Sequence, residues 1–214
     1  MDIELIKANL LSTSRVQTPS SKLLGVLNAV SKAELSELLK SLYEANVANR
    51  GLQVKFDQYT YEKISKVSSW LFTSKKPGLL LYGKCGTGKT TMIRCILRMM
   101  KAGRKIEDVR FLTAKELYDC YRDESRKNHY IGVSEAKVVF IDDLGCEPEK
   151  CLIYGTEYTP IRDFIYYRYD HQLFTIISTN LDDDALTKRY GERVWDRMQE
   201  AFDRILYAGD SYRG

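Results

Sequence analysis

The chain lacks the features that would place a protein in a membrane or in an oxidising compartment. It has no run of about 18 apolar residues that could form a transmembrane helix, and acidic Asp2 and Glu4 near its start do not fit a secretory signal peptide. Its five cysteines are an odd number, so they cannot all be paired in disulfides. Cys146 and Cys151 form a C-x4-C pair without a second pair or nearby histidines, so we predict no zinc site. We expect a cytoplasmic protein with no membrane partner.

The net charge and the absence of sequence repeats exclude no further class of function. The net charge of +4 is mildly basic, which permits contact with nucleic acid without requiring it. The sequence contains no internal repeat and no low-complexity tract. With 214 residues, of which 44% are hydrophobic, the chain has room for one α/β domain and a small appendage.

The most informative stretch is a glycine-rich sequence between a strand pattern and a helix pattern. Residues 83–90 have the spacing G-x-x-x-x-G-K-T, directly after the apolar run 79–82. Glycines let the backbone approach a phosphate and point its N–H groups inward, and the helix that begins near Lys89 adds its positive end. Lys89 can reach the outer phosphates, and the Thr90 hydroxyl can bind Mg²⁺. We predict that ATP with Mg²⁺ is bound by Gly83, Lys84, Cys85, Gly86, Thr87, Gly88, Lys89, Thr90 and Thr91.

Strand and helix patterns alternate after this loop. Helix patterns are present at 114–126, 161–169 and 182–201, and strand patterns at 109–113, 138–143, 173–178 and 204–207. Since the strands are uniformly apolar and are separated by helices, they predict a parallel sheet covered by helices on both faces. Together with the phosphate loop, this pattern predicts an α/β fold of the P-loop NTPase class.

Residues 1–52 are predicted to be a helical N-terminal segment that binds a partner, ahead of an ATPase domain at 53–214. Residues 3–10 have weak helical spacing, and the polar run 12–21 is typical of a linker. A capping box begins a stronger helix pattern at 31–49. Such short helices either pack on the next domain or present their apolar face to another protein, and the sequence leaves both interpretations open.

Polar residues follow two of the predicted strands. Asp142 and Asp143 end a strand about fifty residues after the phosphate loop, and Asn180 follows the next strand. Ligands collect at the carboxyl edge of a parallel sheet. We predict that Asp142 binds Mg²⁺, Asp143 polarises the attacking water, and Asn180 holds that water or contacts the γ-phosphate. Two adjacent carboxylates would repel each other without a cation, which also favours a metal here.

Taken together, these motifs resemble AAA+ ATPases of the DnaC/IstB type, which are bacterial replicative-helicase loaders and transposase helper ATPases. The resemblance covers about residues 53–214 and has the motifs in the same order. It depends on the phosphate loop, the strand end 141–145, the segments 178–181 and 190–198, and the ending 209–213. The zinc-binding cysteines that some loaders carry in the N-terminal region are missing, so the docking of a partner cannot be transferred.

The resemblance implies a role for each motif. It makes the phosphate loop Walker A, the two carboxylates Walker B, and Asn180 sensor 1. It also implies that Arg197 is an arginine finger supplied in trans to a neighbouring subunit, with Arg193 as the alternative. These two arginines are four apart on one helix face, and without the resemblance they would be interpreted as surface charge. Members of the family lack a large helical lid, and few residues follow Arg197.

The function implied by the resemblance is that of an ATP-dependent helicase loader. ATP-bound subunits would form a homo-oligomer, contact single-stranded DNA, and load or remodel a replicative helicase through residues 1–50. A helper ATPase of a DDE transposase uses the same motifs, which do not separate the two. An alternative of another class is a small P-loop phosphoryl-transfer kinase, which needs neither a trans arginine nor Asn180. The intact Walker residues disfavour a scaffold that does not hydrolyse ATP.

Two further segments each have two interpretations. Residues 54–57 either contact the adenine base or only lead into a helix predicted at 57–72. Residues 122–130 lie where initiator-type relatives face single-stranded DNA. Their cations, with His129 and Tyr130, suit backbone contact and stacking, but Asp123 and Glu124 fit a solvated loop equally well.

Overall fold

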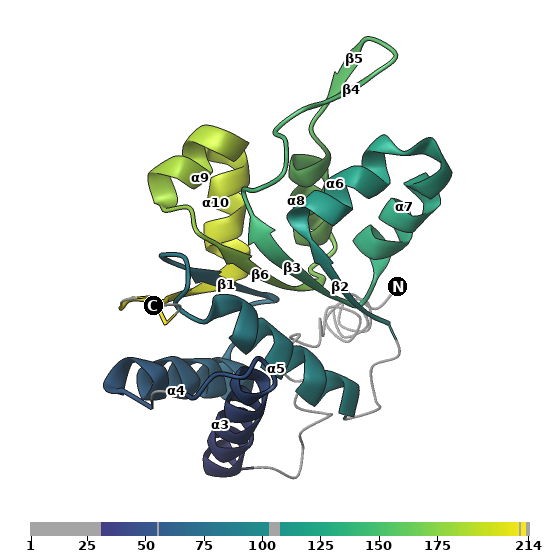
Figure 1. Ribbon diagram of the computed structural model, residues 1–214. Helices are drawn as coiled ribbons and strands as arrows, with labels where there is room; N and C mark the ends of the chain where they lie inside the picture. Colours follow the sequence, from purple (N-terminus) through teal and green to yellow (C-terminus); the bar gives the residue numbers. More distant parts are fainter. Residues whose placement is uncertain (1–30, 55, 103–107, 210, 213–214) are drawn as a thin grey trace, which may run out of the picture.

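A five-stranded parallel sheet forms the centre of the computed structural model, which describes residues 31–54, 56–102, 108–209 and 211–212 (Figure 1). The strand order is β2-β3-β6-β1-β7, and all neighbouring strands are parallel. The bounds are β1 Gly78–Tyr82, β2 Val109–Thr113, β3 Val138–Leu144, β6 Phe174–Thr179 and β7 Phe202–Leu206. The helical spacing predicted at 3–10 and the linker at 12–21 lie outside the described residues.

The strand order brings the predicted motifs to one edge of the sheet. β6 lies between β1, which leads into the phosphate loop, and β3, which ends in Asp142 and Asp143. The central strands are apolar on both faces, with Leu79, Leu80 and Ile177 fully buried. Such strands must be covered on both faces, and parallel strands place all their carboxyl ends on one side.

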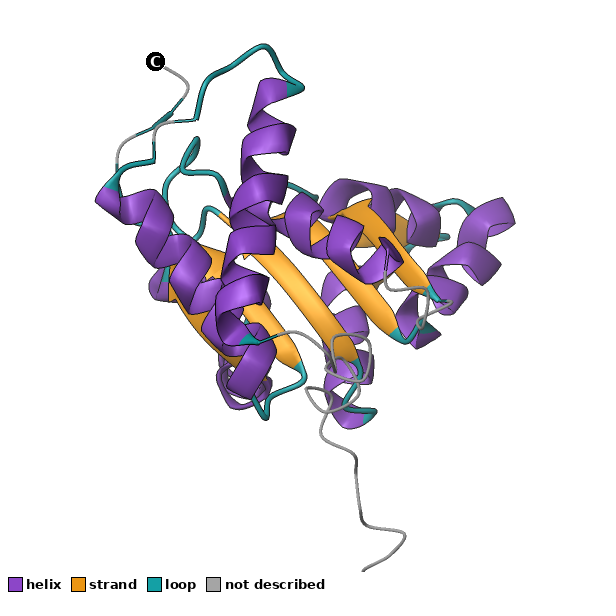
Figure 2. Ribbon diagram, turned by 90° about the horizontal axis from the view of Figure 1, so that it is seen from below, coloured by secondary structure: helices purple, strands orange, loops and turns teal. Residues whose placement is uncertain are grey.

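Helices cover both faces of this sheet (Figures 1 and 2). One face carries α3 (Lys32–Ala48), α4 (Gln58–Thr73) and α5 (Lys89–Ala102). The opposite face carries α6 (Ala114–Arg122), α7 (Lys127–Glu135), α8 (Pro160–Asp170), α9 (Asp183–Tyr190) and α10 (Glu192–Ala201). The predicted fold class is confirmed. Among the helices described, none is both long enough and apolar enough to cross a membrane.

Helix α3 packs on the core that covers one face of the sheet. The predicted capping box begins it, because the Ser31 side chain accepts a hydrogen bond from the Glu34 N–H while the Glu34 carboxylate accepts one from the Ser31 N–H. Its buried residues Leu35, Leu39 and Tyr43 join the same core cluster as β1 and α5. For α3, the first of the two interpretations therefore holds, whereas the boundary at residue 52 stays a prediction.

The segment after α6 is helical, and the prediction of one continuous helix over 114–126 is wrong. Helix α6 ends at Arg122, a short 3-10 turn covers Glu124–Arg126, and α7 follows. The break occurs because the Asp123 carboxylate accepts a hydrogen bond from the Ser125 N–H at 3.0 Å, which competes with the helical pattern. Since Tyr130 is buried, this segment is not simply a solvated loop.

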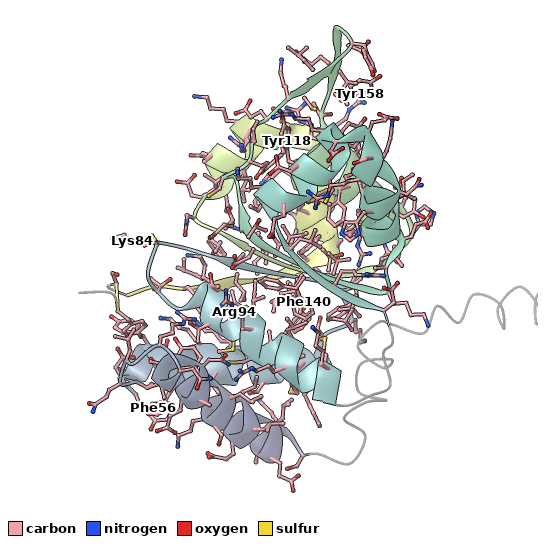
Figure 3. The ribbon with its side chains drawn as sticks, turned by 45° about the vertical axis from the view of Figure 1, so that its right-hand side comes forward. Phe56, Lys84, Arg94, Tyr118, Phe140 and Tyr158 are labelled. Atoms are coloured by element: carbon pink, nitrogen blue, oxygen red, sulfur yellow. The ribbon has the colours of Figure 1, made fainter. Side chains whose placement is uncertain are left out.

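A hairpin that the sequence analysis did not predict follows β3. Strands β4 (Cys151–Ile153) and β5 (Thr156–Tyr158) pair antiparallel and project beyond α6 and α8 (Figures 1 and 3). The turn residues Tyr154 and Gly155 have φ of 49° and 81°, as in a two-residue hairpin turn. The pair Tyr-Gly lacks the asparagine or aspartate that usually marks such a turn, and strands this short have no clear alternation.

A buried arginine joins α8 to the sheet and to the end of α7. Arg168 is 2% exposed. Its guanidinium donates hydrogen bonds to the Thr175 hydroxyl at 2.9 Å and to the Ser134 carbonyl at 3.1 Å, and it also bonds to the carbonyls of Ala136 and Phe174. Its described partners include no carboxylate in ion-pair contact. The arginine therefore satisfies carbonyls that would otherwise be buried without donors.

Replacing Arg168 with methionine should lower the free energy of unfolding by about 3 kcal/mol, because three buried carbonyls lose their donor. Urea denaturation followed by circular dichroism measures the change. The matched control is Arg110→Met, which removes only an exposed ion pair with Asp108 and should cost less than about 1 kcal/mol. Equal losses in the two variants would contradict this role of Arg168.

Candidate functional site

A cavity of about 220 Å³ opens at the carboxyl edge of the sheet, where the phosphate loop lies. The loop lines one side, with Lys84 exposed at its tip (Figure 3). Asp143 and Asn180 line a second side, at the ends of β3 and β6. The remaining lining comes from α3, from residues 52–54 and from Tyr212. A cavity of this kind at the edge of a parallel α/β sheet is the usual place for a nucleotide.

Two glycines of the loop are required by their surroundings. Gly83 has φ of 134°, and a Cβ there would lie 2.6 Å from the backbone oxygen of Tyr207. Gly88 has φ of 94°, and a Cβ there would overlap the hydroxyl of Tyr43. Side chains are strained at such φ values, and neither position has room for one. The loop backbone therefore packs against Tyr207, which follows β7, and against Tyr43 of α3.

The side chain of Lys89 bridges the two ends of the phosphate loop. Its ammonium donates hydrogen bonds of 2.7 Å to the carbonyls of Gly83 and Lys84 and to Oδ1 of Asn180. The residue is only 5% exposed. Burial lowers its pKa, while the negative charges of the nearby Asp143 and Asp142 carboxylates act in the opposite direction. The structure thus brings Lys89 and Asn180 into contact, and both face the place where the outer phosphates of a nucleotide would lie.

One serine contacts both aspartates of the predicted Walker B pair, through the carboxylate of Asp142 and the backbone N–H of Asp143. The Ser178 hydroxyl donates to Oδ1 of Asp142 and accepts a hydrogen bond from the Asp143 N–H at 3.0 Å. Thr90 also donates to Oδ1 of Asp142, at 3.1 Å. A hydroxyl and a carboxylate held at the phosphate loop are oxygen donors of the kind that Mg²⁺ prefers. Thr90 and Asp142 therefore fit the predicted metal site.

Asp143 lies at an irregularity of the sheet. The register of β3 against β6 shifts between Ile141 and Leu144, and Asp143 has φ of 56°, in the left-handed region. This conformation costs energy for a residue with a side chain and is common at functional sites. Asp143 lines the cavity. The bulge thus places the second carboxylate on the nucleotide side of the strand end.

The loop after β3 is joined to the end of α9 by a buried carboxylate. Glu147 accepts hydrogen bonds from the Gly145 N–H at 2.9 Å and from the Tyr190 hydroxyl. Arg189 pairs with the same carboxylate at 3.5 Å. Burial, followed by the charge of Glu147, raises the pKa of Tyr190 far above its ordinary value, so its hydroxyl keeps its proton and donates it. Glu147 therefore connects the segment that begins at Tyr190 to the loop that follows β3.

The two candidate arginine fingers do not lie in this cavity. Arg197 on α10 pairs with Asp170 at 3.4 Å, and its guanidinium lies over the rings of Tyr166 and Tyr169 at 4.4 and 5.0 Å. Arg193 is exposed one turn earlier on the same helix. Neither lines the cavity of its own subunit. Their role in trans stays a prediction.

Several lining residues were not assigned by the sequence analysis. Tyr43 and Arg50 come from α3 and the turn after it, and Tyr212 bonds through its N–H to the Gly86 carbonyl at 3.1 Å. Of residues 54–57, Val54 lines the cavity, and Asp57 caps α4. Tyr212 lies in the ending that contributed to the resemblance, whereas no sequence motif marks Tyr43 or Arg50.

Comparisons with known proteins agree with this architecture. Residues 79–147 match the family described as ATPase family associated with various cellular activities (AAA). The replicative helicase loader DnaI of Bacillus subtilis is 26% identical over 148 residues, which are 66% of this chain and 47% of DnaI. The chain thus spans about half the length of this curated relative.

Two solved structures share the fold. The DnaC helicase loader superposes with a TM-score of 0.55 at 21% identity, covering 72% of this chain and 92% of that one. DnaI superposes with a TM-score of 0.59 at 19% identity, covering 83% and 93%. At these identities the superpositions show the fold, which is that of DnaC and DnaI. Together with the AAA match and the curated relative, they confirm the resemblance to AAA+ ATPases of the DnaC type.

Replacing Ser178 with alanine should weaken Mg²⁺-dependent ATP hydrolysis about 10- to 100-fold, because the Asp142 carboxylate loses a hydroxyl that orients it and the Asp143 N–H loses its acceptor. Titration of ATPase activity with Mg²⁺ measures the change, and affinity for ATP without metal should be retained. The control is Ser68→Ala, which removes another buried hydroxyl, bonded to the Ile64 carbonyl in α4. Wild-type Mg²⁺ dependence in Ser178→Ala would contradict its role.

Proposed function

We propose that this chain is an ATP-dependent loader that assembles through ATP-bound subunits, contacts single-stranded DNA, and loads or remodels a replicative helicase in the cytoplasm. The observation that carries the proposal is that Lys89, Thr90 and Asn180 line one cavity, where Thr90 also bonds to Asp142. These residues come from three adjacent strand ends and combine cation, hydroxyl, carboxylate and amide. The AAA match and the likeness to the loaders DnaI and DnaC support the same function.

The arrangement assigns a task to each group. The phosphate loop and Lys89 would bind the phosphates, with Lys89 exchanging its carbonyl partners for phosphate oxygens. Thr90 and Asp142 would hold Mg²⁺, which neutralises charge on the outer phosphates when bound. The Asp143 carboxylate would accept a proton from the attacking water, and the Asn180 amide would orient that water.

Assembly into a homo-oligomer would complete the site. At the Asn180 end of the cavity, Lys89 is the single cation among the described lining residues. A second cation would be needed to stabilise the charge that develops on the γ-phosphate in the transition state. Arg197 contacts two tyrosine rings and one carboxylate at the surface. These contacts orient its side chain and could be exchanged for contacts with a neighbouring subunit. A neighbouring subunit that docks its α10 against the cavity would supply this arginine, and Arg193 is the alternative.

The proposed partners are a client protein and single-stranded DNA. The curated relative DnaI loads a replicative helicase, which makes a helicase the first candidate. Residues 1–30, which precede α3, would bind the helicase. The exposed cations around α7 include Lys127, which pairs with Glu124 at 3.7 Å, so contact with single-stranded DNA would depend on rearranging such pairs. A DDE transposase remains the alternative client, and a small phosphoryl-transfer kinase remains the alternative of another class.

Mixing two inactive variants should restore ATP hydrolysis if Arg197 acts in trans. Asp143→Asn retains the arginine, and Arg197→Ala retains its own carboxylates. Each should be slowed by about 10³ or more alone, whereas an equal mixture should recover about one quarter of the wild-type rate through mixed interfaces. Steady-state ATPase assays over a range of protein concentrations measure this.

Arg193→Ala, mixed in the same way, tests the alternative finger, and Arg110→Ala is the control for loss of an exposed arginine. A mixture as inactive as its components would argue against a composite site. Full activity of Arg197→Ala at every protein concentration would favour the kinase.

Pull-down with the full chain in ATP should capture the replicative helicase, and a variant that lacks residues 1–30 should lose the capture while binding ATP normally. Immunoblotting for the helicase measures the first result, and calorimetric titration with ATP measures the second. Capture of a transposase without helicase would replace the proposed client, and equal capture by the shortened variant would place the contact elsewhere.

A further inference from the structure

One face of α3 and its C-terminal turn lies against the phosphate loop. Tyr43, Val47 and Arg50 are spaced i, i+4, i+7, so they share this face, and all three line the nucleotide cavity. The face is held in place by Asn46, whose side-chain amide donates to Sγ of Cys95 on α5 at 3.2 Å. None of the three lining residues belongs to the Walker or sensor motifs.

Arg50 is positioned at the start of α5. Its Nη2 donates to Oγ1 of Thr91 at 3.0 Å, and Thr91 directly follows the Walker A threonine. Gly51, with φ of 72°, ends the helix and directs the following residues along the cavity. An arginine has five N–H donors, and this is the single bond that Arg50 makes through its side chain to the residues described. The other donors are available to a ligand.

Tyr43 provides a second, independent indication of a ligand. The residue is 4% exposed, and its hydroxyl lies against Gly88 at the cavity wall. Within the described part of the chain, this hydroxyl makes no hydrogen bond. The hydroxyl is not among the buried atoms that lack a partner, so it is open to the cavity and can bond to a ligand there. Burial raises the pKa of Tyr43 well above its ordinary value, so the group is a neutral donor.

The two ends of the cavity can be distinguished by their contacts. At one end, Lys89 bonds to Asn180 and Thr90 bonds to Asp142, which suits the outer phosphates. At the other end, Arg50 bonds to Thr91 beside apolar Leu52 and Val54. A bound nucleoside triphosphate would therefore run from Asn180 toward residues 52–54, with its base over the apolar side chains.

We propose that Arg50 and Tyr43 form an α-phosphate site that α3 contributes to the nucleotide pocket of its own subunit. The inference extends the proposed ATP binding and rests on it. A charged, multiply donating guanidinium suits a phosphate, and the hydroxyl of Tyr43 adds a second donor beside Gly88. Since ATP and ADP share the α-phosphate, this site binds both, in contrast to groups that contact only the γ-phosphate.

Calorimetric titration of ATP and ADP with Mg²⁺ tests the proposal. Arg50→Ala should weaken the affinity for both nucleotides by the same factor of about 10, Arg50→Lys should recover part of the loss, and Tyr43→Phe should weaken both about 3-fold. The matched control is Lys32→Ala, which removes an exposed cation from the first turn of the same helix. In hydrogen exchange, ADP should protect the α3 amides of the wild type and protect them less in Arg50→Ala.

The outcomes separate this inference from the proposed function. Wild-type affinity for both nucleotides in Arg50→Ala, alongside loss of binding in Lys89→Ala, would overturn the α-phosphate site and leave the ATPase proposal intact. A loss for ATP alone would place Arg50 at the γ-phosphate and would also overturn it. Failure of the wild type to bind either nucleotide would overturn both. Thermal melting without nucleotide, unchanged in Arg50→Ala and Tyr43→Phe, shows that the variants are folded.

Discussion

The site depends on one buried ammonium group. Lys89 is held by two carbonyls of its own loop and by the amide oxygen of Asn180, all at 2.7 Å. A buried cation needs such partners, because its loss of hydration is otherwise uncompensated. Because Lys89 bonds to the carbonyls of Gly83 and Lys84, the loop folds back on itself. The bond to Asn180 joins the loop to the end of β6. Phosphate oxygens would compete with these three oxygens for the ammonium group.

Strand order extends this local constraint to the whole molecule. Because β6 lies between β1 and β3, Ser178 and Asn180 can each reach a different neighbour. Ser178 fixes Asp142 and the backbone of Asp143, and Glu147 continues the chain of contacts to Tyr190. The cavity is therefore linked through short polar contacts to α9, and α9 packs directly beside the helix that carries Arg197. The cavity and the surface of α10 that carries Arg197 are therefore joined by one series of contacts.

Candidate residues could be located from the sequence wherever they lie within one contiguous motif. Residues 83–90 and the Ser31 capping box are local patterns, and Asp142 and Asn180 could be placed because parallel strands end on one side. The contributions of Tyr43 and Arg50 could not be predicted, since they depend on where α3 docks and no local rule specifies this. The hairpin at Tyr154 lacked its usual turn residues, and the break at Asp123 arose from a single side-chain bond.

The packing around the phosphate loop has a consequence for synthesis of the protein. The backbone of Tyr207 abuts Gly83, Ser211 abuts Gly86, and Tyr43 abuts Gly88. A chain still emerging from the ribosome would expose every nucleotide-binding motif before residues 207–212 were free to pack on the loop. The contacts of Tyr207 and Ser211 with the loop would thus form last, so a truncated translation product would carry the motifs without this packing around them.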